Sequence, residues 1–256
     1  MTTGIDRLIT VSASHYCEKA RWALDRRGVP YREEAHVPLL SWVATFGSGG
    51  RRTVPVLVTA SGVLSDSTDI AAYADRVGSA GDRLVPDDAD LAEEVRDLED
   101  LFDEKLGPAT RRLGYHMLLR DREALLRLWT ASAPSVERGL ARVMYPMLRQ
   151  AVVRGLVVDE AGVARSRERL ADCFDVVHRR IASGRRYLVG DRFTLADLTF
   201  ASLAAPVLLP ETYAGALPRW SAMSGEAQAS MLPWREHPAG RFALRLFETE
   251  RRRAAH

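Results

Sequence analysis

Cysteine and lysine are both scarce in this sequence. Its 256 residues include two cysteines, Cys17 and Cys173, which fall in what we expect to be different domains. Two distant cysteines without a third partner exclude a disulfide framework and a cysteine-based zinc site, and they indicate a reducing compartment. The only lysines are Lys19 and Lys105, so arginine supplies nearly all of the positive charge. We attribute this bias to genome composition rather than to phosphate recognition.

Long apolar runs are absent as well. No segment reaches the roughly 20 residues that span a bilayer, and no apolar stretch of signal-peptide length follows Met1. We therefore expect a cytoplasmic protein. The 36 basic and 34 acidic residues nearly cancel and are interspersed, so we expect neither a nucleic acid nor a membrane surface as a partner. The six histidines are scattered without the spacing of metal ligands, and we expect no metal site.

The order of the expected elements divides the chain into two domains. Up to residue 80, strand and helix signals alternate as βαβ and then ββα, which is typical of a thioredoxin-like α/β unit. We expect strands at 8–11, 31–37, 54–58 and 63–65, and helices at 15–27 and 67–77. Residues 78–90 are rich in Gly, Ser, Pro and Asp and form the expected linker. We therefore place an α/β domain at 1–80 and a second domain at 90–256.

The second domain is expected to be all helical. Helical patterns cover 91–106, 109–119, 123–131, 135–153, 165–183, 195–205 and 238–252. Proline lacks a backbone N–H, so Gly107-Pro108 is expected to interrupt the first of these helices and Pro206 to end the sixth. Arg251, Arg252 and Arg253 are expected to close the last helix, where cations complement the helix dipole.

The clearest helix start in the chain lies at Thr194. Its hydroxyl is expected to cap the amide of Asp197, while the Asp197 carboxylate returns to the Thr194 amide. Removing such a cap costs roughly 1 kcal/mol. We therefore expect a structural role for this segment and not a catalytic one.

Ser14 and Cys17 stand at the start of the first expected helix, directly after the first strand. Peptide N–H groups point outward there and the helix dipole is positive, so a thiolate or a carboxylate is favoured. The arrangement therefore predicts a site for an anionic group. Ser14 is equally suited to be the helix N-cap, and the two roles are compatible.

Five segments carry motifs that occur in a defined order along the chain: Ser14-His15-Tyr16-Cys17 with residues 18–24, residues 28–31, Val54-Pro55, Asp66-Ser67 with Ile70, and Gly190-Asp191 with residues 194–197. In this combination and order the chain resembles the cytosolic glutathione transferases. The resemblance implies a thioredoxin-like α/β amino-terminal domain with a mixed four-stranded sheet and an all-α carboxy-terminal helical-bundle domain. It also implies that glutathione, the co-substrate, binds mainly to the first domain and that an electrophile lies between the two.

The same resemblance assigns the glutathione contacts. Val54-Pro55 matches the family's cis-proline position, which leaves the backbone of Val54 free to pair with the cysteinyl unit; a plain edge-strand proline is the alternative. Asp66-Ser67 opens a helix, where Ser67 and the helix amides can bind the γ-glutamyl carboxylate and Asp66 the ammonium group. An N-cap without a ligand is the alternative for Asp66-Ser67.

The loop before the proline is expected to hold the other end of the tripeptide. We assign Thr53 and Arg52 to the glutathione site, because arginine binds carboxylates in a bidentate manner and the glycine carboxylate lies at this end. Arg51 and Trp42 are alternatives to Arg52.

Ser14 matches the serine that several transferase classes use. Its O–H is expected to donate to the glutathione sulfur and to favour the thiolate together with the helix terminus. A pKa drop of two units requires roughly 3 kcal/mol, which one charge-assisted hydrogen bond and a helix dipole can supply. Cys17 leaves two interpretations open: one turn before Arg21 its pKa can be low enough for thiol–disulfide exchange, or it packs inertly in the core.

The electrophile is expected to meet the first helices of the second domain. Arg111, Tyr115 and His116 fall on or near one helix face that borders the cleft, and Tyr16 is a further candidate contact. Ordinary interdomain packing is the alternative for the residues on the second-domain helix, and packing on the core is the alternative for Tyr16. The second domain departs from the family pattern through an apparent insertion near 125–165, which can lid the cleft, extend a dimer interface or do neither.

These observations predict an enzyme that activates the glutathione thiolate for attack on a small electrophile, without a metal or a covalent enzyme intermediate. Two alternatives are a glutathione-dependent thiol–disulfide oxidoreductase that uses Cys17, and a non-catalytic transferase-like binding or scaffold protein. The sequence does not distinguish glutathione from another low-molecular-weight thiol. The resemblance further implies a homodimer and a role in detoxification.

Overall fold

A mixed four-stranded sheet lies at the centre of the amino-terminal domain in the computed structural model, which describes residues 5–251. Its strands are β1 (Asp6–Thr10), β2 (Tyr31–Ala35), β3 (Val56–Thr59) and β4 (Gly62–Leu64), in the spatial order β2-β1-β3-β4. β1 runs parallel to β2 and antiparallel to β3, so that Leu8 stands opposite both Glu33 and Leu57. The predicted sheet is confirmed, with strand ends that differ by one or two residues from the predicted ones.

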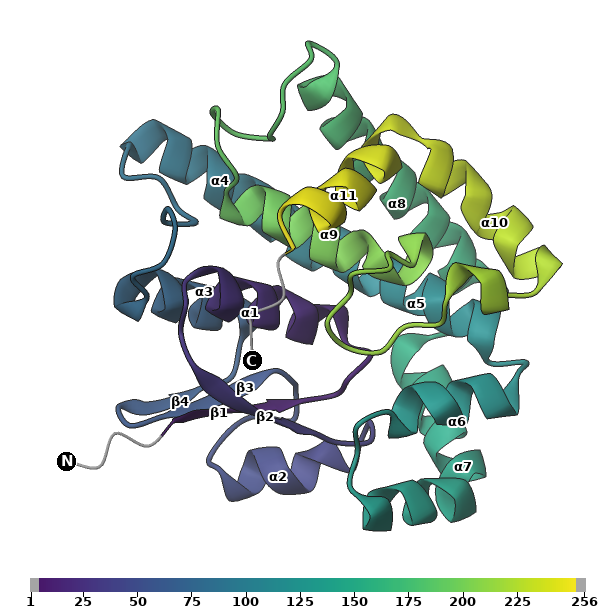
Figure 1. Cartoon of the computed structure of the whole chain (residues 1–256). Helices are drawn as coiled ribbons and strands as arrows, with labels where there is room; N and C mark the ends of the chain where they lie inside the picture. Colours follow the sequence, from purple (N-terminus) through teal and green to yellow (C-terminus); the bar gives the residue numbers. More distant parts are fainter. Residues whose placement is uncertain (1–4, 252–256) are drawn as a thin grey trace.

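Helices cover both faces of this sheet (Figure 1). α1 (His15–Arg26) and α3 (Ser67–Val77) pack side by side on one face, and α2 (Ser41–Gly47) lies on the other. The starts of α1 and α3 are predicted correctly because capping side chains, Ser14 and Asp66, mark them in the sequence. α2 is not predicted, because it has no side-chain cap and exposes apolar residues such as Val43.

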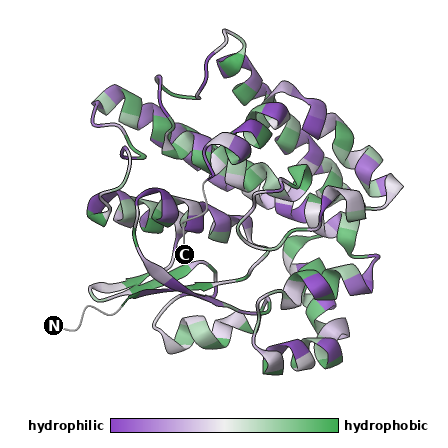
Figure 2. Cartoon of the chain, in the orientation of Figure 1, coloured by the Kyte–Doolittle hydropathy of each residue, from purple (hydrophilic) through white to green (hydrophobic). Residues whose placement is uncertain are grey.

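The carboxy-terminal domain is helical, as predicted. Within the described range its helices are α4 (Ala89–Leu101), the π-helix η1 (Phe102–Leu106), α5 (Gly107–Leu118), α6 (Arg122–Thr130), α7 (Ser135–Leu156), α8 (Glu160–Ile181), α9 (Leu195–Leu208), the short 3-10 helix η2 (Trp220–Ala222), α10 (Gly225–Glu236) and α11 (Pro238–Thr249). Polar and apolar residues are mixed along most of these helices (Figure 2), as expected for helices with one solvated face. α10 was not predicted, although Ser224 caps it.

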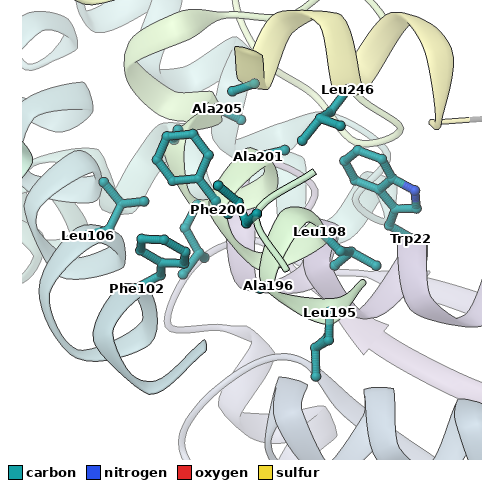
Figure 3. Packing of buried hydrophobic residues seen from close by; sticks show 14 of the residues in the cluster. Trp22, Phe102, Leu106, Leu195, Ala196, Leu198, Phe200, Ala201, Ala205 and Leu246 are labelled. Atoms are coloured by element: carbon teal, nitrogen blue, oxygen red, sulfur yellow. The ribbon is translucent and has the colours of Figure 1, made fainter. Parts of the chain in front are cut away.

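α9 occupies the centre of the hydrophobic core. Every residue of this helix is buried, and Figure 3 shows Phe200 and Leu198 surrounded by side chains of other elements. Those neighbours include Trp22 from α1, Phe102 from η1 and Leu246 from α11. The core is therefore shared between the two domains.

The prediction that Pro206 ends this helix at Ala205 is wrong. α9 continues to Leu208, and Val207 and Leu208 are 1% and 0% exposed. A proline inside a helix removes one backbone hydrogen bond, but burying two large apolar side chains favours the helical conformation by a comparable amount.

Helix geometry changes directly before Gly107-Pro108. The regular α-helix ends at Leu101, and in the following π-helical turn the Gly107 N–H donates to the Phe102 carbonyl. Pro108 has no N–H and cannot continue the α-helical bonding pattern. The predicted interruption is confirmed, and Pro108 lies in the first turn of α5, where a helix tolerates proline.

The capping box at the start of α9 is also confirmed. The Thr194 N–H donates to Asp197 Oδ2 over 2.9 Å, and Asp197 Oδ1 accepts the N–H of Leu188 over 2.8 Å. The carboxylate therefore secures the preceding loop as well as the helix start.

The end of the chain differs from the prediction. α11 ends at Thr249, so Arg251 does not close it, and Arg252 and Arg253 lie outside the described residues. Arg251 is buried and forms ion pairs of 2.8 Å with Glu18 and with Asp25 of α1. These pairs fix the carboxy-terminal segment to the helix that Ser14 caps.

Residues 125–165 contribute to a second hydrophobic cluster around α6 and α7. Trp129 and Tyr145 lie in this cluster together with Val37 from the amino-terminal domain. Glu137 of α7 accepts the Val37 N–H over 2.8 Å and lies 2.6 Å from His36 Nδ1. α7 is thereby tied to the loop after β2, near α2 (Figure 1).

Membrane-spanning helices and clusters of metal-binding side chains are both absent from residues 5–251. No helix there combines the length and the apolar character that crossing a membrane requires. In the same part of the chain, no group of three or more His, Cys, Asp or Glu side chains is arranged to hold a metal ion.

Candidate functional site

A cavity of about 500 Å³ lies between the start of α1 and the helical domain. Its lining residues include Ser14, His15, Trp42, Arg52, Thr53 and Val54 on one side and Arg111, Tyr115, Leu118, Val152, Gly155, Leu156, Pro206, Leu217 and Met231 on the other. Polar groups therefore gather at the amino-terminal domain, and the helical domain supplies mostly apolar walls. α7 forms part of those walls, so the apparent insertion covers this cavity.

Ser14 is the N-cap of α1 and is half-buried at the cavity wall. Its Oγ accepts the Cys17 N–H over 3.4 Å, which confirms the capping role. The Ser14 side chain also forms a hydrogen bond that lowers the pKa of the Cys17 thiol, after the larger effects of burial, which raises it, and of Arg21. A thiol is a weak acceptor, so an anion in the cavity competes well for the Ser14 proton. The hydroxyl and the helix terminus together favour an anion at this position.

His15 is 2% exposed, and its Nε2 lies 3.0 Å from the Gly107 carbonyl. Burial, with a smaller effect from the charge of Arg111, lowers the pKa of His15 to about 3. The ring is therefore neutral near pH 7, and Nε2–H donates to the Gly107 carbonyl. His15 ties α1 to α5 and is not an acid–base group at neutral pH.

Tyr16 lies in the domain interface and not among the residues that line the cavity. Its hydroxyl donates to the Asp103 carbonyl over 2.8 Å, and a Cβ at Gly107 would collide with the same hydroxyl. Burial raises its pKa, Arg111 acts in the opposite direction, and the charges of Asp103 and Asp66 raise it further. Its contacts are therefore those of a packing residue, here against the helical domain and not against a molecule in the cavity.

Cys17 is 0% exposed and does not line the cavity. Burial raises the pKa of its thiol despite the nearby charge of Arg21. A reactive cysteine requires access and a lowered pKa, and Cys17 has neither. The structure favours the inert interpretation of Cys17.

The peptide bond between Val54 and Pro55 is cis, as the family resemblance implies. Thr53 and Val54 line the cavity, and Val54 has no backbone hydrogen bond to another described residue. Its backbone groups are therefore available to an extended ligand. Pro55 follows just outside the lining.

Arg52 also lines the cavity, and its guanidinium lies 5.6 Å from the ring centre of Trp42 and 5.8 Å from that of Phe46. Two aromatic rings thus hold an arginine at the edge of the cavity. The alternative residue Arg51 is exposed and absent from the lining.

Asp66 and Ser67 begin α3, outside the lining of the cavity. Asp66 Oδ1 accepts the Thr68 N–H over 2.8 Å, so Asp66 is an N-cap, and its side chain is exposed. Ser67 is 3% exposed. Burial raises the pKa of Tyr16, Arg111 lowers it, and Asp103 and then Asp66 raise it further. The charge of Asp66 therefore lies near the Tyr16 side chain.

A buried ion network that the sequence analysis missed joins this region to the helical domain. Lys19 is fully buried, and its Nζ lies 2.6 Å from Glu99 Oε1 and 2.6 Å from Asp103 Oδ2. It also donates to Thr68 Oγ1 over 3.1 Å, one residue after Ser67. The available signals were the rarity of lysine and the four-residue spacing of Glu99 and Asp103, which places both on one helix face.

The three predicted electrophile contacts on α5 separate into two groups. Arg111 and Tyr115 line the cavity that contains Ser14, whereas His116 lines a different cavity. The guanidinium of Arg111 lies 5.9 Å from the ring centre of Tyr16. Burial is the main cause of the lowered pKa of His15, and the charge of Arg111 lowers it further. Arg111 therefore brings a positive charge close to the residues that flank Ser14.

Sequence models of two domain families match the chain. The model of the glutathione S-transferase N-terminal domain matches residues 8–77, and that of the glutathione S-transferase C-terminal domain matches residues 160–235. Together they cover more than half of the chain. No curated protein matches the sequence significantly.

Solved structures resemble the chain over nearly its whole length. A glutathione S-transferase from Xanthobacter autotrophicus Py2 is 17% identical with a TM-score of 0.61, covering 98% of this chain and 95% of that one. One from Methylobacterium radiotolerans JCM 2831, in complex with glutathione sulfonate, is 19% identical with a TM-score of 0.55 and coverage of 93% and 94%. One from Rhodospirillum rubrum F11 is 25% identical with a TM-score of 0.53 and coverage of 93% and 91%. The fold and both family models agree, and the chain belongs to the glutathione S-transferase family.

Proposed function

We propose that this protein is a glutathione transferase, in which Ser14 stabilises the glutathione thiolate and the interdomain cavity holds a small electrophile. The observation that carries the proposal is the position of Ser14. Its hydroxyl lies at the start of α1, on the wall of a cavity whose other side is mostly apolar. Glutathione sulfonate is the molecule bound by the Methylobacterium radiotolerans relative, and we propose that this chain also takes glutathione.

The tripeptide is held by the amino-terminal domain in this proposal. The backbone of Val54 pairs with the cysteinyl unit, and Arg52 binds the glycine carboxylate. Asp66 and Ser67, at the start of α3, bind the γ-glutamyl end. The exposed carboxylate of Asp66 and the free backbone groups of Val54 support these assignments.

The reaction requires a thiolate and an oriented carbon electrophile. Ser14 and the helix terminus lower the thiol pKa, and Arg111 adds a nearby positive charge. The thiolate attacks the carbon and a C–S bond forms; a leaving group departs with its bonding pair, or, in an addition, the substrate takes up a proton. Tyr115, whose phenolic proton remains available, donates to the oxygen on which negative charge develops.

The alternative reaction through Cys17 is less well supported, because its thiol is buried and its pKa is raised. A binding or scaffold protein without turnover remains the competing class. The discriminating experiment combines calorimetric titration with glutathione and mass-spectrometric detection of thioethers formed from aryl halides and enones. Binding with turnover supports the proposal, and binding without turnover supports the scaffold. Absence of glutathione binding, with binding of another small thiol, would contradict the proposed co-substrate.

We further propose a cytoplasmic homodimer that acts in detoxification. Exposed apolar side chains on α7, namely Val136, Leu140, Val143 and Met147, recur at helical spacing and favour association. Light scattering coupled to size-exclusion chromatography measures the oligomeric state, and a monomer at micromolar concentration contradicts the dimer.

A further inference from the structure

A second cavity, of about 620 Å³, lies against α5 and α6. Its lining includes four arginines, Arg120, Arg127, Arg167 and Arg219, and two carboxylates, Asp121 and Glu226. We call it the basic cavity and the cavity that contains Ser14 the apolar cavity. The chain as a whole has almost equal numbers of acidic and basic residues, so this excess of positive charge is a local feature.

The two cavities adjoin. Six residues line both of them: Met117, Leu118, Leu128, Leu217, Pro218 and Met223. All six have apolar side chains, so no polar side chain lines both cavities. The apolar cavity, the shared apolar side chains and the basic cavity together suit a molecule with an apolar middle section.

The two carboxylates compensate only part of the positive charge of the basic cavity. Asp121 caps α6 through the Ala124 N–H, and Glu226 lies 3.6 Å from Arg120. The side chains of Arg127 and Arg167 form no hydrogen bond or ion pair with the described residues, and the same holds for Arg219 at the edge of η2. Anions are therefore favoured in this cavity over neutral molecules.

His116 also lines the basic cavity. Burial lowers its pKa, and the charges of Arg167 and Arg120 lower it further, against the opposite effect of Glu226. Arg120, in the turn after α5, and Arg167 of α8 both act on this one ring and both line the basic cavity.

We propose that the electrophile is an amphipathic organic acid: its reactive apolar end occupies the apolar cavity beside Ser14, and its carboxylate or sulfonate lies among the arginines of the basic cavity. This inference rests on the proposed function, because it names the class of its substrate. Such a ligand gains apolar burial at one end and charge-assisted hydrogen bonds at the other.

The test uses calorimetric binding of 6-phenylhexanoate and of its amide to the full-length protein. The two probes share one apolar skeleton and differ in charge. Arg167→Gln removes one charge from the basic cavity, and Arg169→Gln is the matched control, because Arg169 is exposed two residues further along α8 and lines neither cavity. Gly155→Leu reduces the apolar cavity alone; a Cβ at Gly155 meets no atom within 4 Å, so the helix accommodates the change.

The carboxylate is expected to bind at least fivefold more tightly than the amide, with a difference that shrinks at high salt. Arg167→Gln is expected to weaken binding of the carboxylate about fivefold and to leave binding of the amide unchanged. Arg169→Gln is expected to change the affinity of neither probe. Gly155→Leu is expected to weaken both probes. Three results would each overturn the proposal. They are equal affinity for the two probes, equal effects of the two arginine variants, and an affinity for the carboxylate that Gly155→Leu does not change. These measurements need no turnover, so a failure of glutathione conjugation is detected separately.

Discussion

The indole nitrogen of Trp129 donates a hydrogen bond of 3.1 Å to the hydroxyl oxygen of Tyr115. Because an indole N–H can only donate, the phenolic proton of Tyr115 remains for another acceptor. Tyr115 lines the apolar cavity, and burial raises its pKa, so the hydroxyl stays protonated at neutral pH. Trp129 thus holds a Tyr115 hydroxyl whose own proton is not used in that hydrogen bond.

Tyr115→Phe is expected to lower kcat/KM about tenfold for electrophiles that carry an oxygen acceptor, the equivalent of roughly 1.4 kcal/mol for one lost hydrogen bond. Glutathione affinity is expected to stay the same, since the tripeptide lies on the other domain. Steady-state kinetics and calorimetry measure the two quantities. The role assigned to Tyr115 is wrong if kcat/KM is unchanged for such substrates.

Lys19→Met tests the buried ion network between the domains. The substitution leaves Glu99 and Asp103 without their cation, and breaking a buried pair costs about 3–5 kcal/mol. Urea denaturation monitored by circular dichroism measures the free energy of unfolding. Lys105→Met is the matched control, because it removes the other lysine, which is exposed. Equal losses for the two variants would show that the network does not stabilise the fold.

Cys17→Ala is expected to retain glutathione conjugation. The thiols of Cys17 and Cys173 are 0% and 1% exposed, and burial raises both pKa values, so neither is expected to react with a thiol reagent in the native protein. Ellman titration with and without urea counts the accessible thiols. Rapid native labelling at Cys17, together with loss of a glutathione-dependent disulfide reductase activity in Cys17→Ala, would favour the redox alternative.

The pKa of His15 predicts a pH dependence of stability. It is lowered from 6.5 to about 3 in the folded protein, so between these values the unfolded chain binds a proton that the folded chain does not. Stability is therefore lost as the pH falls through this window, by up to about 1.4 kcal/mol per pH unit, and His15 has no effect above it.

His15→Gln keeps an N–H donor for Gly107 and does not titrate. Its free energy of unfolding is expected to fall less steeply than that of the wild type between pH 6.5 and 4.5. The comparison must be made between the two proteins, because burial raises the pKa of Asp197 from 3.8 to about 6. Proton uptake by Asp197 in the folded protein therefore increases stability as the pH falls through the same window, opposite in sign to the effect of His15. Parallel curves would show that His15 titrates normally in the folded protein.

The parts of the fold that the sequence predicts are those with local causes. Ser14, Asp66 and Thr194 begin helices through contacts within three residues, and each is found at its predicted helix start. The location of Pro206 misled the prediction, because burial of the last turn of α9 depends on distant elements. Local patterns therefore set where helices begin more reliably than where they end.

The site is predicted only in part, because much of it depends on contacts between distant residues. Tyr115 and His116 are adjacent in sequence, yet they line different cavities. The Lys19 network joins residues about 80 positions apart, and α7 covers the apolar cavity through its contact with the loop after β2. No pattern within a single segment encodes these relationships.

The most direct measurement of the central claim is the pKa of glutathione bound to the wild type, to Ser14→Ala and to Ser14→Thr, followed by the ultraviolet absorbance of the thiolate. The ordinary thiol pKa is about 8.5, and the wild type is expected to lower it by about two units. In Ser14→Ala the pKa of bound glutathione is expected to rise by at least one unit from the wild-type value. In Ser14→Thr, which keeps the hydroxyl, it is expected to stay close to the wild-type value. An unshifted pKa in the wild type, or equal values for all three proteins, would contradict thiolate stabilisation by Ser14.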